Sequence, residues 1–304
     1  MELNLLGTYR NGNYNVSIYE DGTKIRFAKE LSENDNFEAE FPESFDFKIT
    51  GFCDAGCNFC HENSSIKGKH ADIMSPSFID TLHPFTEIAI GGGNPLSHPD
   101  LIPFLEKLKE KQIIANMTVN QMHFLIQEEL VKELVDKKLI KGLGISVIYP
   151  DDMLIETLEK GNYTNVVFHV INGIFTKEHY DSLKKYSNSK ILFLGYKDLR
   201  RGINYHKNNN LEVEKNQKWL FDNLEEISKN IHVISFDNLA LKQLDVKRLM
   251  SEKDWKHFYM GDDGTHTLFV DMVERIYAKS STNPIRRPIL SNMDEMFQII
   301  KNDK

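Results

Sequence analysis

One stretch of the sequence reads Ile49-Thr50-Gly51-Phe52-Cys53-Asp54-Ala55-Gly56-Cys57-Asn58-Phe59-Cys60. It holds all three cysteines of the 304-residue chain, and we call residues 53–60 the cysteine loop. A tetrahedral zinc site or a fully ligated iron–sulfur cluster takes four protein ligands, one more than the C-x3-C-x2-C spacing supplies. The fourth metal position is therefore open or is filled by another residue type. An open position on an iron cluster is reactive, so the cysteine loop indicates chemistry rather than structural cross-linking.

Three other interpretations of the cysteine loop remain to be weighed. Three thiols in a chain of this size do not form a disulfide framework, and Met1–Thr8 lacks the basic start and apolar run of a secretory segment. Cys57–His61 spells C-x-x-C-H, the signature for attachment of c-type haem, but that attachment requires export. Zinc with His61 or His70 as fourth ligand stays open as the alternative metal site.

The composition excludes some classes of function. The net charge of −8 argues against a general nucleic-acid binder, which needs a cationic surface to displace counterions. We find no apolar run long enough to span a bilayer. The basic runs Lys197–Arg201 and Arg286–Arg287 are short and typical of solvated surface. We therefore expect a cytoplasmic protein with no membrane partner, in which the thiols stay reduced and available to metal.

Short apolar segments alternate with amphipathic ones from Phe45 onward. Helices are predicted after Ser75-Pro76, over Leu101–Lys111 after an N-cap at Ser97–Asp100, and over His123–Lys138. The candidate strands are Phe45–Thr50, Glu87–Ile90, Ile114–Val119, Leu143–Ile148, Asn165–Val170, Lys190–Leu194 and His232–Phe236. Six or seven such units predict an α/β fold with a parallel sheet, either doubly wound or a barrel.

Both ends of the chain have a different pattern. Tyr14–Tyr19 and Lys24–Ala28 flank a turn, so residues 1–44 are predicted to form a β-meander. Residues 241–304 are expected to hold a small β-hairpin, built from Leu268–Val270 and Arg275–Ala278, and a last helix within Pro288–Lys304. The alternating part, residues 45–240, is the expected core.

The chemically distinctive residues follow the predicted strands at their carboxyl ends. The cysteine loop follows the first strand, Gly91–Pro95 follows the second, and Asn120 follows the third. Ser146 is late in the fourth strand, and Gly195–Lys197 follows the sixth. Ligands of parallel α/β folds bind at this edge of the sheet, so we expect one site built from distant loops. His61 and the other polar residues that follow Cys60 are expected to border it.

A strand, then C-x3-C-x2-C with Phe59 before the last cysteine, then a glycine-rich end to the second strand resembles the radical S-adenosylmethionine (SAM) superfamily. The resemblance covers residues 45–240 and implies a partial (β/α)6 TIM-like barrel. It implies that Cys53, Cys57 and Cys60 bind three irons of a [4Fe-4S] cluster, whose fourth iron binds SAM. Reduction of the cluster then splits SAM to a 5′-deoxyadenosyl radical, with electrons from an external flavodoxin- or ferredoxin-type donor.

The resemblance also implies the contacts to SAM. Gly91, Gly92, Gly93 and Asn94 stand where the family has a Gly-Gly-Glu segment that receives the amine of SAM; here asparagine replaces the acidic residue. Glycines there let backbone carbonyls approach an ammonium group. The further expected contacts are Phe59 near the adenine, Ser146 at the carboxylate or ribose, and Asn120 at the third-strand Thr-Asn position.

The absence of further cysteines narrows the reaction. No cysteine follows Cys60, which excludes auxiliary thiolate-bound clusters, a cysteine hydrogen-atom donor and cysteine-dependent methylation. We expect hydrogen abstraction from a peptide or protein side chain, because terminal β-elements can receive a further strand. A nucleotide or small metabolite remains an alternative substrate. A non-catalytic zinc-binding adaptor, or a relative that binds SAM only to sense it, are alternatives of a different class.

Overall fold

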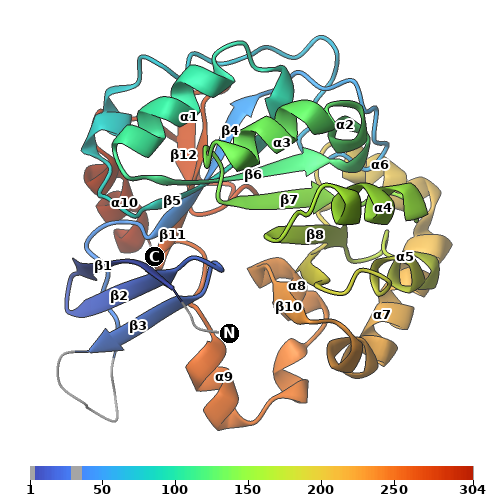
Figure 1. Cartoon of the computed structure of the whole chain (residues 1–304). Coiled ribbons are helices and arrows are strands. Elements are labelled where there is room, and N and C mark those ends of the chain that lie inside the picture. Colours follow the sequence, from blue (N-terminus) through green and yellow to red (C-terminus); the bar gives the residue numbers. More distant parts are fainter. Residues whose placement is uncertain (1–3, 29–35, 304) are drawn as a thin grey trace.

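The structure is a computed structural model and describes residues 4–28 and 36–303. Parts of the two predicted terminal regions, 1–44 and 241–304, lie outside these ranges, as does the start of Met1–Thr8. The strands of these described residues form one sheet of three and one of ten, and the helices pack around the larger sheet (Figure 1). None of the helices in the described ranges is long and apolar enough to cross a membrane.

Seven parallel strands make up most of the large sheet. They are β4 (Ser44–Thr50), β5 (Glu87–Gly92), β6 (Ile114–Asn120), β7 (Gly142–Ser146), β8 (Val166–Ile171), β9 (Lys190–Leu194) and β10 (Val233–Phe236). The sheet runs in the order β10-β9-β8-β7-β6-β5-β4 and continues into three C-terminal strands without closing on itself. The predicted partial α/β barrel is confirmed, and the seven strand predictions match to within two residues.

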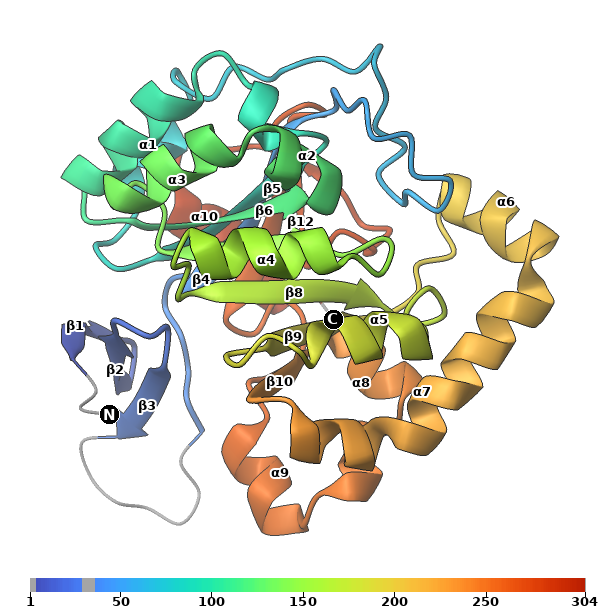
Figure 2. The same cartoon turned by 45° about the vertical axis from the view of Figure 1, so that its right-hand side comes forward.

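The connecting helices cover the outer face of the curved sheet (Figure 2). They are α1 (Leu101–Glu110), α2 (Gln121–Ile126), α3 (Glu128–Asp136), α4 (Asp152–Lys160), α5 (Lys177–Leu183), α6 (Arg201–Asn208), α7 (Asn210–Asn230) and α8 (Asn238–Gln243). The alternation along β4 shows why: Phe45, Phe47 and Ile49 are buried against the helices, whereas Asp46 and Lys48 point to the other face. The apolar core thus lies between sheet and helices, and on β4 the inner face carries charged side chains.

Two helix predictions were wrong in detail. His123–Lys138 is not one helix but α2 and α3, separated at Gln127, whose backbone angles of −117° and 32° interrupt the helix. Ser75-Pro76 precedes only a short 3-10 helix, η1 (Ser77–Thr81): Pro76 is its extended N-cap rather than its first helical residue, and no side chain caps the segment. Neither change alters the order of the strands.

The C-terminal hairpin belongs to the large sheet. β11 (Thr267–Asp271) pairs antiparallel with β12 (Ile276–Ala278), as predicted, and β13 (Arg287–Pro288) follows. β11 also lies parallel to β4, so the sheet gains strands on the side away from β5. The other C-terminal elements are η3 (Val246–Leu249), α9 (Glu252–Phe258) and α10 (Met293–Asn302).

The predicted meander is present as β1 (Leu5–Asn11), β2 (Tyr14–Tyr19) and β3 (Lys24–Ala28). A buried carboxylate ties it to the large sheet: Glu43, just before β4, accepts hydrogen bonds from the Tyr14 hydroxyl (2.5 Å) and Arg26 Nε (2.7 Å). Lys24 adds ion pairs to Glu43 (3.4 Å) and to Glu87 at the start of β5 (2.5 Å). The meander therefore sits at the amino ends of the strands, away from the cysteine loop.

Candidate functional site

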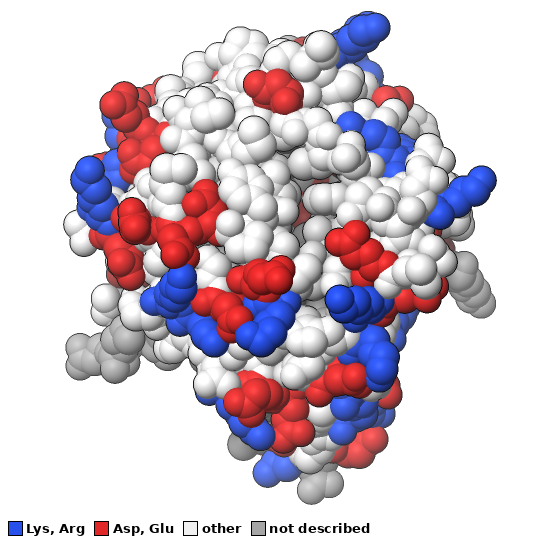
Figure 3. Space-filling model, turned by 90° about the vertical axis from the view of Figure 1, so that its right-hand side faces the viewer, with Lys and Arg blue, Asp and Glu red and all other residues white. Residues whose placement is uncertain are grey.

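The carboxyl ends of the parallel strands bring the predicted site residues to one edge. Thr50 pairs with Gly92, Asn120 with Ser146, and Ser146 with His169 in the register of the sheet. The cysteine loop begins three residues after Thr50. Figure 3 shows the side of the molecule toward which the arrows of β6 and β7 point in Figure 1. The surface is hollowed near the centre of this view, and the residues around the hollow are mainly uncharged.

The glycine segment after β5 holds the start of the cysteine loop against the sheet. Gly93 N–H donates to the Thr50 carbonyl (2.8 Å), and Asn94 N–H donates to the Phe52 carbonyl (2.6 Å). A Cβ on Gly93 would lie 2.0 Å from the Phe52 oxygen. Gly92 has a φ of +115°, and a Cβ there would lie 2.5 Å from the Thr50 oxygen. Only glycine fits at these two positions.

Gly91 differs from its neighbours because its Cβ direction is open. An added Cβ would meet no atom within 4 Å, and the residue has no positive φ. Asn94 is buried, and its amide oxygen accepts a hydrogen bond from Leu96 N–H (3.2 Å), which caps the 3-10 helix η2 (Pro95–Ser97). The segment thus combines two positions packed on the cysteine loop, one open position and one capping side chain.

The three thiols are free and partly buried. Asn120 Nδ2 donates to Cys57 Sγ at 3.5 Å, while its amide oxygen caps α2. Burial raises the pKa of Cys53 and Cys57, and the neighbouring thiols raise the pKa of Cys57 further. A bound cation supplies the positive charge that buried thiolates need. In residues 4–28 and 36–303, no group of three His, Cys, Asp or Glu side chains is placed to hold a single metal ion.

A buried ion-pair cluster lies beside the end of the cysteine loop. Lys48 Nζ, on the inner face of β4, lies 2.6 Å from Glu62 Oε2 and 2.9 Å from Asp271 Oδ2 of β11. Arg200 Nη1 lies 3.2 Å from the same Glu62 oxygen. Burial alone would raise the pKa of Glu62, but its contacts with His61 and Lys48 lower the pKa overall. Glu62 is therefore an anion that joins the cysteine loop to β4 and to the segment before α6.

A small hollow of about 30 Å³ lies where the cysteine loop meets the ends of β8 and β9. It is lined by Phe59, His61, Ile171, Leu194, Gly195, Tyr196 and Lys197. The Phe59 ring packs edge-on against Tyr205 of α6, with centroids 5.6 Å apart. Lys197 Nζ lies 3.5 Å from His61 Nε2 and donates to Ser281 Oγ at 3.1 Å. The structure thus brings Phe59 together with the segment after β9, as the sequence predicts.

Sequence reasoning missed two histidines. His123 Nε2, on α2, lies 2.7 Å from Asp54 Oδ1 and so fastens the cysteine loop to that helix. His169 of β8 lies over Gly144, where a Cβ would be 2.7 Å from His169 Nε2 and 2.9 Å from Thr118 Oγ1. Burial lowers the pKa of His169 to about 4, so the ring is neutral on the inner face. No motif marks either residue; only the period-2 alternation of β8 places His169 inside.

Comparison with known families matches the segment that holds the cysteine loop and the glycine segment. Residues 47–170 match the model of the radical SAM superfamily. This segment is a radical SAM domain. The chain therefore carries a radical SAM domain, and the cofactors of that superfamily are a [4Fe-4S] cluster and SAM. The radical SAM domain includes the cysteine loop, the glycine segment and the ends of β6 and β7.

Solved structures with the same fold include SuiB of Streptococcus suis in three states. SuiB bound to its precursor peptide SuiA aligns with a TM-score of 0.57 and 11% identity, over 96% of this chain and 86% of SuiB. SuiB bound to S-adenosylmethionine aligns with a TM-score of 0.54 and 14% identity, over 88% of this chain and 67% of SuiB. SuiB alone aligns with a TM-score of 0.57 and 12% identity, over 100% of this chain and 88% of SuiB. No curated protein sequence matches the chain. The similarity therefore extends beyond the radical SAM domain as a likeness of fold.

Proposed function

We propose that Cys53, Cys57 and Cys60 bind three irons of the [4Fe-4S] cluster and leave the fourth iron to SAM. Three free thiols of one loop, at the strand-end edge, support this assignment. Asn120 supports it too, because its amide donates to Cys57 Sγ and hydrogen bonds to cluster sulfurs are a usual feature of such sites. When bound, cluster and SAM supply a 5′-deoxyadenosyl radical that abstracts a hydrogen atom from the substrate.

Different residues around the cysteine loop bind different chemical groups of SAM. Gly91 is the observation that carries this proposal, because it is open on its Cβ side while Gly92 and Gly93 are packed. Its backbone is thus accessible to the amine of SAM. Ser146 and Asn120, paired in the sheet, face the carboxylate and ribose. Phe59, which borders the small hollow, forms an apolar wall for the adenine, and neighbouring backbone groups meet the edge of the base.

For the substrate we propose a peptide or protein side chain. The likeness to SuiB, which is described in complex with a precursor peptide, supports this choice, as do the sheet edges of the chain. The net charge of −8 speaks against a large nucleic acid. We assign residues 45–240 to the reaction and the regions 1–44 and 241–304 to accessory roles. An external electron donor of the flavodoxin or ferredoxin type completes the proposed system.

Anaerobic reconstitution with iron and sulfide tests the ligand assignment. We expect a brown protein with about four irons per chain and 5′-deoxyadenosine after addition of SAM and dithionite. Alanine at any one of the three cysteines should lower iron content and abolish 5′-deoxyadenosine. Asn58→Ala, an exposed position within the same loop, is the matched control and should behave as wild type. One colourless zinc per chain, or cysteine variants that keep full iron and turnover, would refute the proposal.

A further inference from the structure

The last strand of the parallel series, β10, has an unpaired edge. In the described part of the chain β10 pairs only with β9. Val233 and Asp237 donate toward β9, to the carbonyls of Ser189 (3.3 Å) and Phe193 (3.0 Å). Successive residues of a strand direct their backbone groups to opposite sides, so the N–H and C=O of Ile234 and Phe236 point away from β9. Outside the pairing of β10 with β9, the backbone of neither residue forms a hydrogen bond with another described residue.

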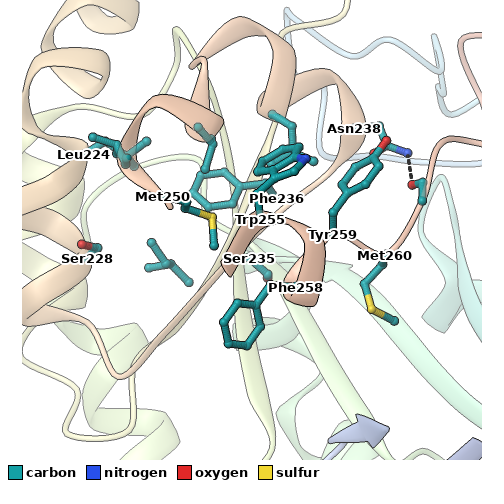
Figure 4. Close-up of a pocket in the computed structure, with 15 residues that line it drawn as sticks. Leu224, Ser228, Ser235, Phe236, Asn238, Met250, Trp255, Phe258, Tyr259 and Met260 are labelled. Atoms are coloured by element: carbon teal, nitrogen blue, oxygen red, sulfur yellow. Dashed lines mark hydrogen bonds between the residues drawn. The ribbon is translucent and has the colours of Figure 1, made fainter. Parts of the chain in front are cut away.

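A cavity of about 480 Å³ lies along this edge. Ile234 and Phe236 are part of its lining, together with residues of α7, α8, η3 and α9. The far wall is aromatic: Trp255 and Tyr259 stack with ring centroids 5.0 Å apart, and Phe258 lines another part of the cavity (Figure 4). Phe258 is 64% exposed, so an apolar side chain stands at a cavity that solvent reaches. The volume is typical of ligand-binding pockets.

We propose that an extended peptide segment pairs with the free edge of β10 and inserts an apolar side chain into this aromatic cavity. The backbone groups of Ile234 and Phe236 alternate in the pattern that another strand satisfies, which favours a peptide over a compact small molecule. The cavity walls carry the side-chain part of the recognition, since aromatic and Met side chains bury apolar groups. The inference deepens the proposed function, on which it rests for its substrate class.

The same geometry connects the cavity to the reaction site. Ser235 pairs with Leu192, which pairs with His169, so these three side chains share the inner face of the sheet. A strand added at β10 would place alternate side chains in the cavity and on that inner face. At the carboxyl end of β10, Asp237 Oδ1 accepts from Gly195 N–H (3.0 Å), and Gly195 lines the hollow beside Phe59. The peptide would thus reach the edge where the cysteine loop lies.

Selection of peptides provides the test, because the natural peptide is unidentified. A random dodecapeptide phage library is panned on the cluster-loaded full-length enzyme without SAM, and the recovered peptides are synthesised with a fluorescent label. We expect peptides in which an apolar residue lies within an alternating pattern of apolar and polar residues, as in a β-strand. Their binding should slow hydrogen exchange at the backbone amides of Ile234 and Phe236. N-methylation of the peptide backbone at alternate residues should weaken binding about tenfold or more, since it removes strand pairing but keeps the side chains.

Two substitutions of exposed phenylalanines distinguish peptide binding at β10 from peptide binding at another sheet edge. Phe258→Glu puts a charge at the cavity and should weaken peptide binding about tenfold or more. Phe27→Glu, on the edge strand β3 with 42% exposure, should leave binding unchanged. If Phe27→Glu is the damaging variant, the peptide docks on β3 and the inference is overturned.

The remaining outcomes also decide the question. Recovery of no peptide, equal binding after N-methylation, or a dimer of the enzyme that Phe258→Glu dissociates would each overturn the inference. Because peptide binding is measured without SAM, its failure is distinct from failure of the proposed function. The latter would appear as missing iron or missing 5′-deoxyadenosine in the wild-type enzyme.

Discussion

Replacement of Gly93 by alanine tests whether the glycine segment holds the cysteine loop in place. The new Cβ would lie 2.0 Å from the Phe52 oxygen and 2.7 Å from the Phe52 carbon, and ordinary van der Waals contact begins near 3.4 Å. Both atoms belong to the backbone, so the two segments must separate by more than a side-chain adjustment allows. Separation also strains the hydrogen bonds Gly93 N–Thr50 O and Asn94 N–Phe52 O.

We expect Gly93→Ala to lower the free energy of unfolding by about 3 kcal/mol, the upper part of the range for overpacking. For a chain of this size that corresponds to a fall in melting temperature on the order of 6 °C. Iron content after reconstitution should fall as well, because Phe52 directly precedes Cys53. Differential scanning calorimetry of the metal-free protein and iron analysis of the reconstituted protein measure the two effects separately.

Gly91→Ala is the matched control two residues earlier. Its Cβ would meet no atom within 4 Å, so the free energy of unfolding should change by less than about 0.5 kcal/mol and iron content should stay at the wild-type level. The added methyl group occupies the open space that we assign to SAM, so 5′-deoxyadenosine formation should require more SAM. If Gly93→Ala melts and binds iron as wild type does, or if the two variants are indistinguishable, the reasoning is refuted.

Three further predictions concern single side chains. Asn120→Ser keeps the cap on α2 but removes the hydrogen-bond donor to Cys57 Sγ. The reduction potential of the cluster should therefore fall by an amount on the order of tens of millivolts, measured in an EPR-monitored redox titration. An unchanged potential would contradict a role for this hydrogen bond. Burial lowers the pKa of His266 to about 4. The free energy of unfolding should therefore fall as the pH drops from 6.5 toward 4, by up to ~1.4 kcal/mol per pH unit. His266→Gln should flatten this pH dependence when it is measured by urea unfolding. Lys48→Met leaves the buried Asp271 without its cation and Glu62 with only the more exposed Arg200, and should cost about 3–5 kcal/mol in urea unfolding. The exposed Lys67→Met should cost little, and equal effects of the two variants would refute the role of the buried ion pairs.

The sequence predicts the strands and the residues at their ends because both leave local signals. Apolar runs between turn residues mark the strands, and the spacing of cysteines and glycines marks the loops. The break at Gln127 leaves no such signal, since the apolar period continues across it. Pairs such as His123 with Asp54 are 69 residues apart and depend on how α2 packs over the strand ends. The placement of β11 beside β4 is likewise set by the tertiary fold.

The cysteine loop is held from both of its ends and from α6. Its entrance is fixed by hydrogen bonds from Cys53 N–H to the Ser65 carbonyl (3.0 Å) and from Ser65 N–H to the Gly51 carbonyl (3.1 Å). From the other side, Arg201 Nη2 of α6 donates to the Ser64 carbonyl (2.6 Å).

Arg200, the residue before α6, donates to the carbonyls of His61 (3.2 Å) and Glu62 (3.1 Å). Because α6 also carries Tyr205, which packs on Phe59, the same helix contacts the residues after the cysteine loop and the proposed wall for the adenine. A displacement of α6 would therefore move the exit of the loop and that wall together. On the assignment proposed above, the helix after β9 would couple the geometry of the three cysteines to the binding of SAM.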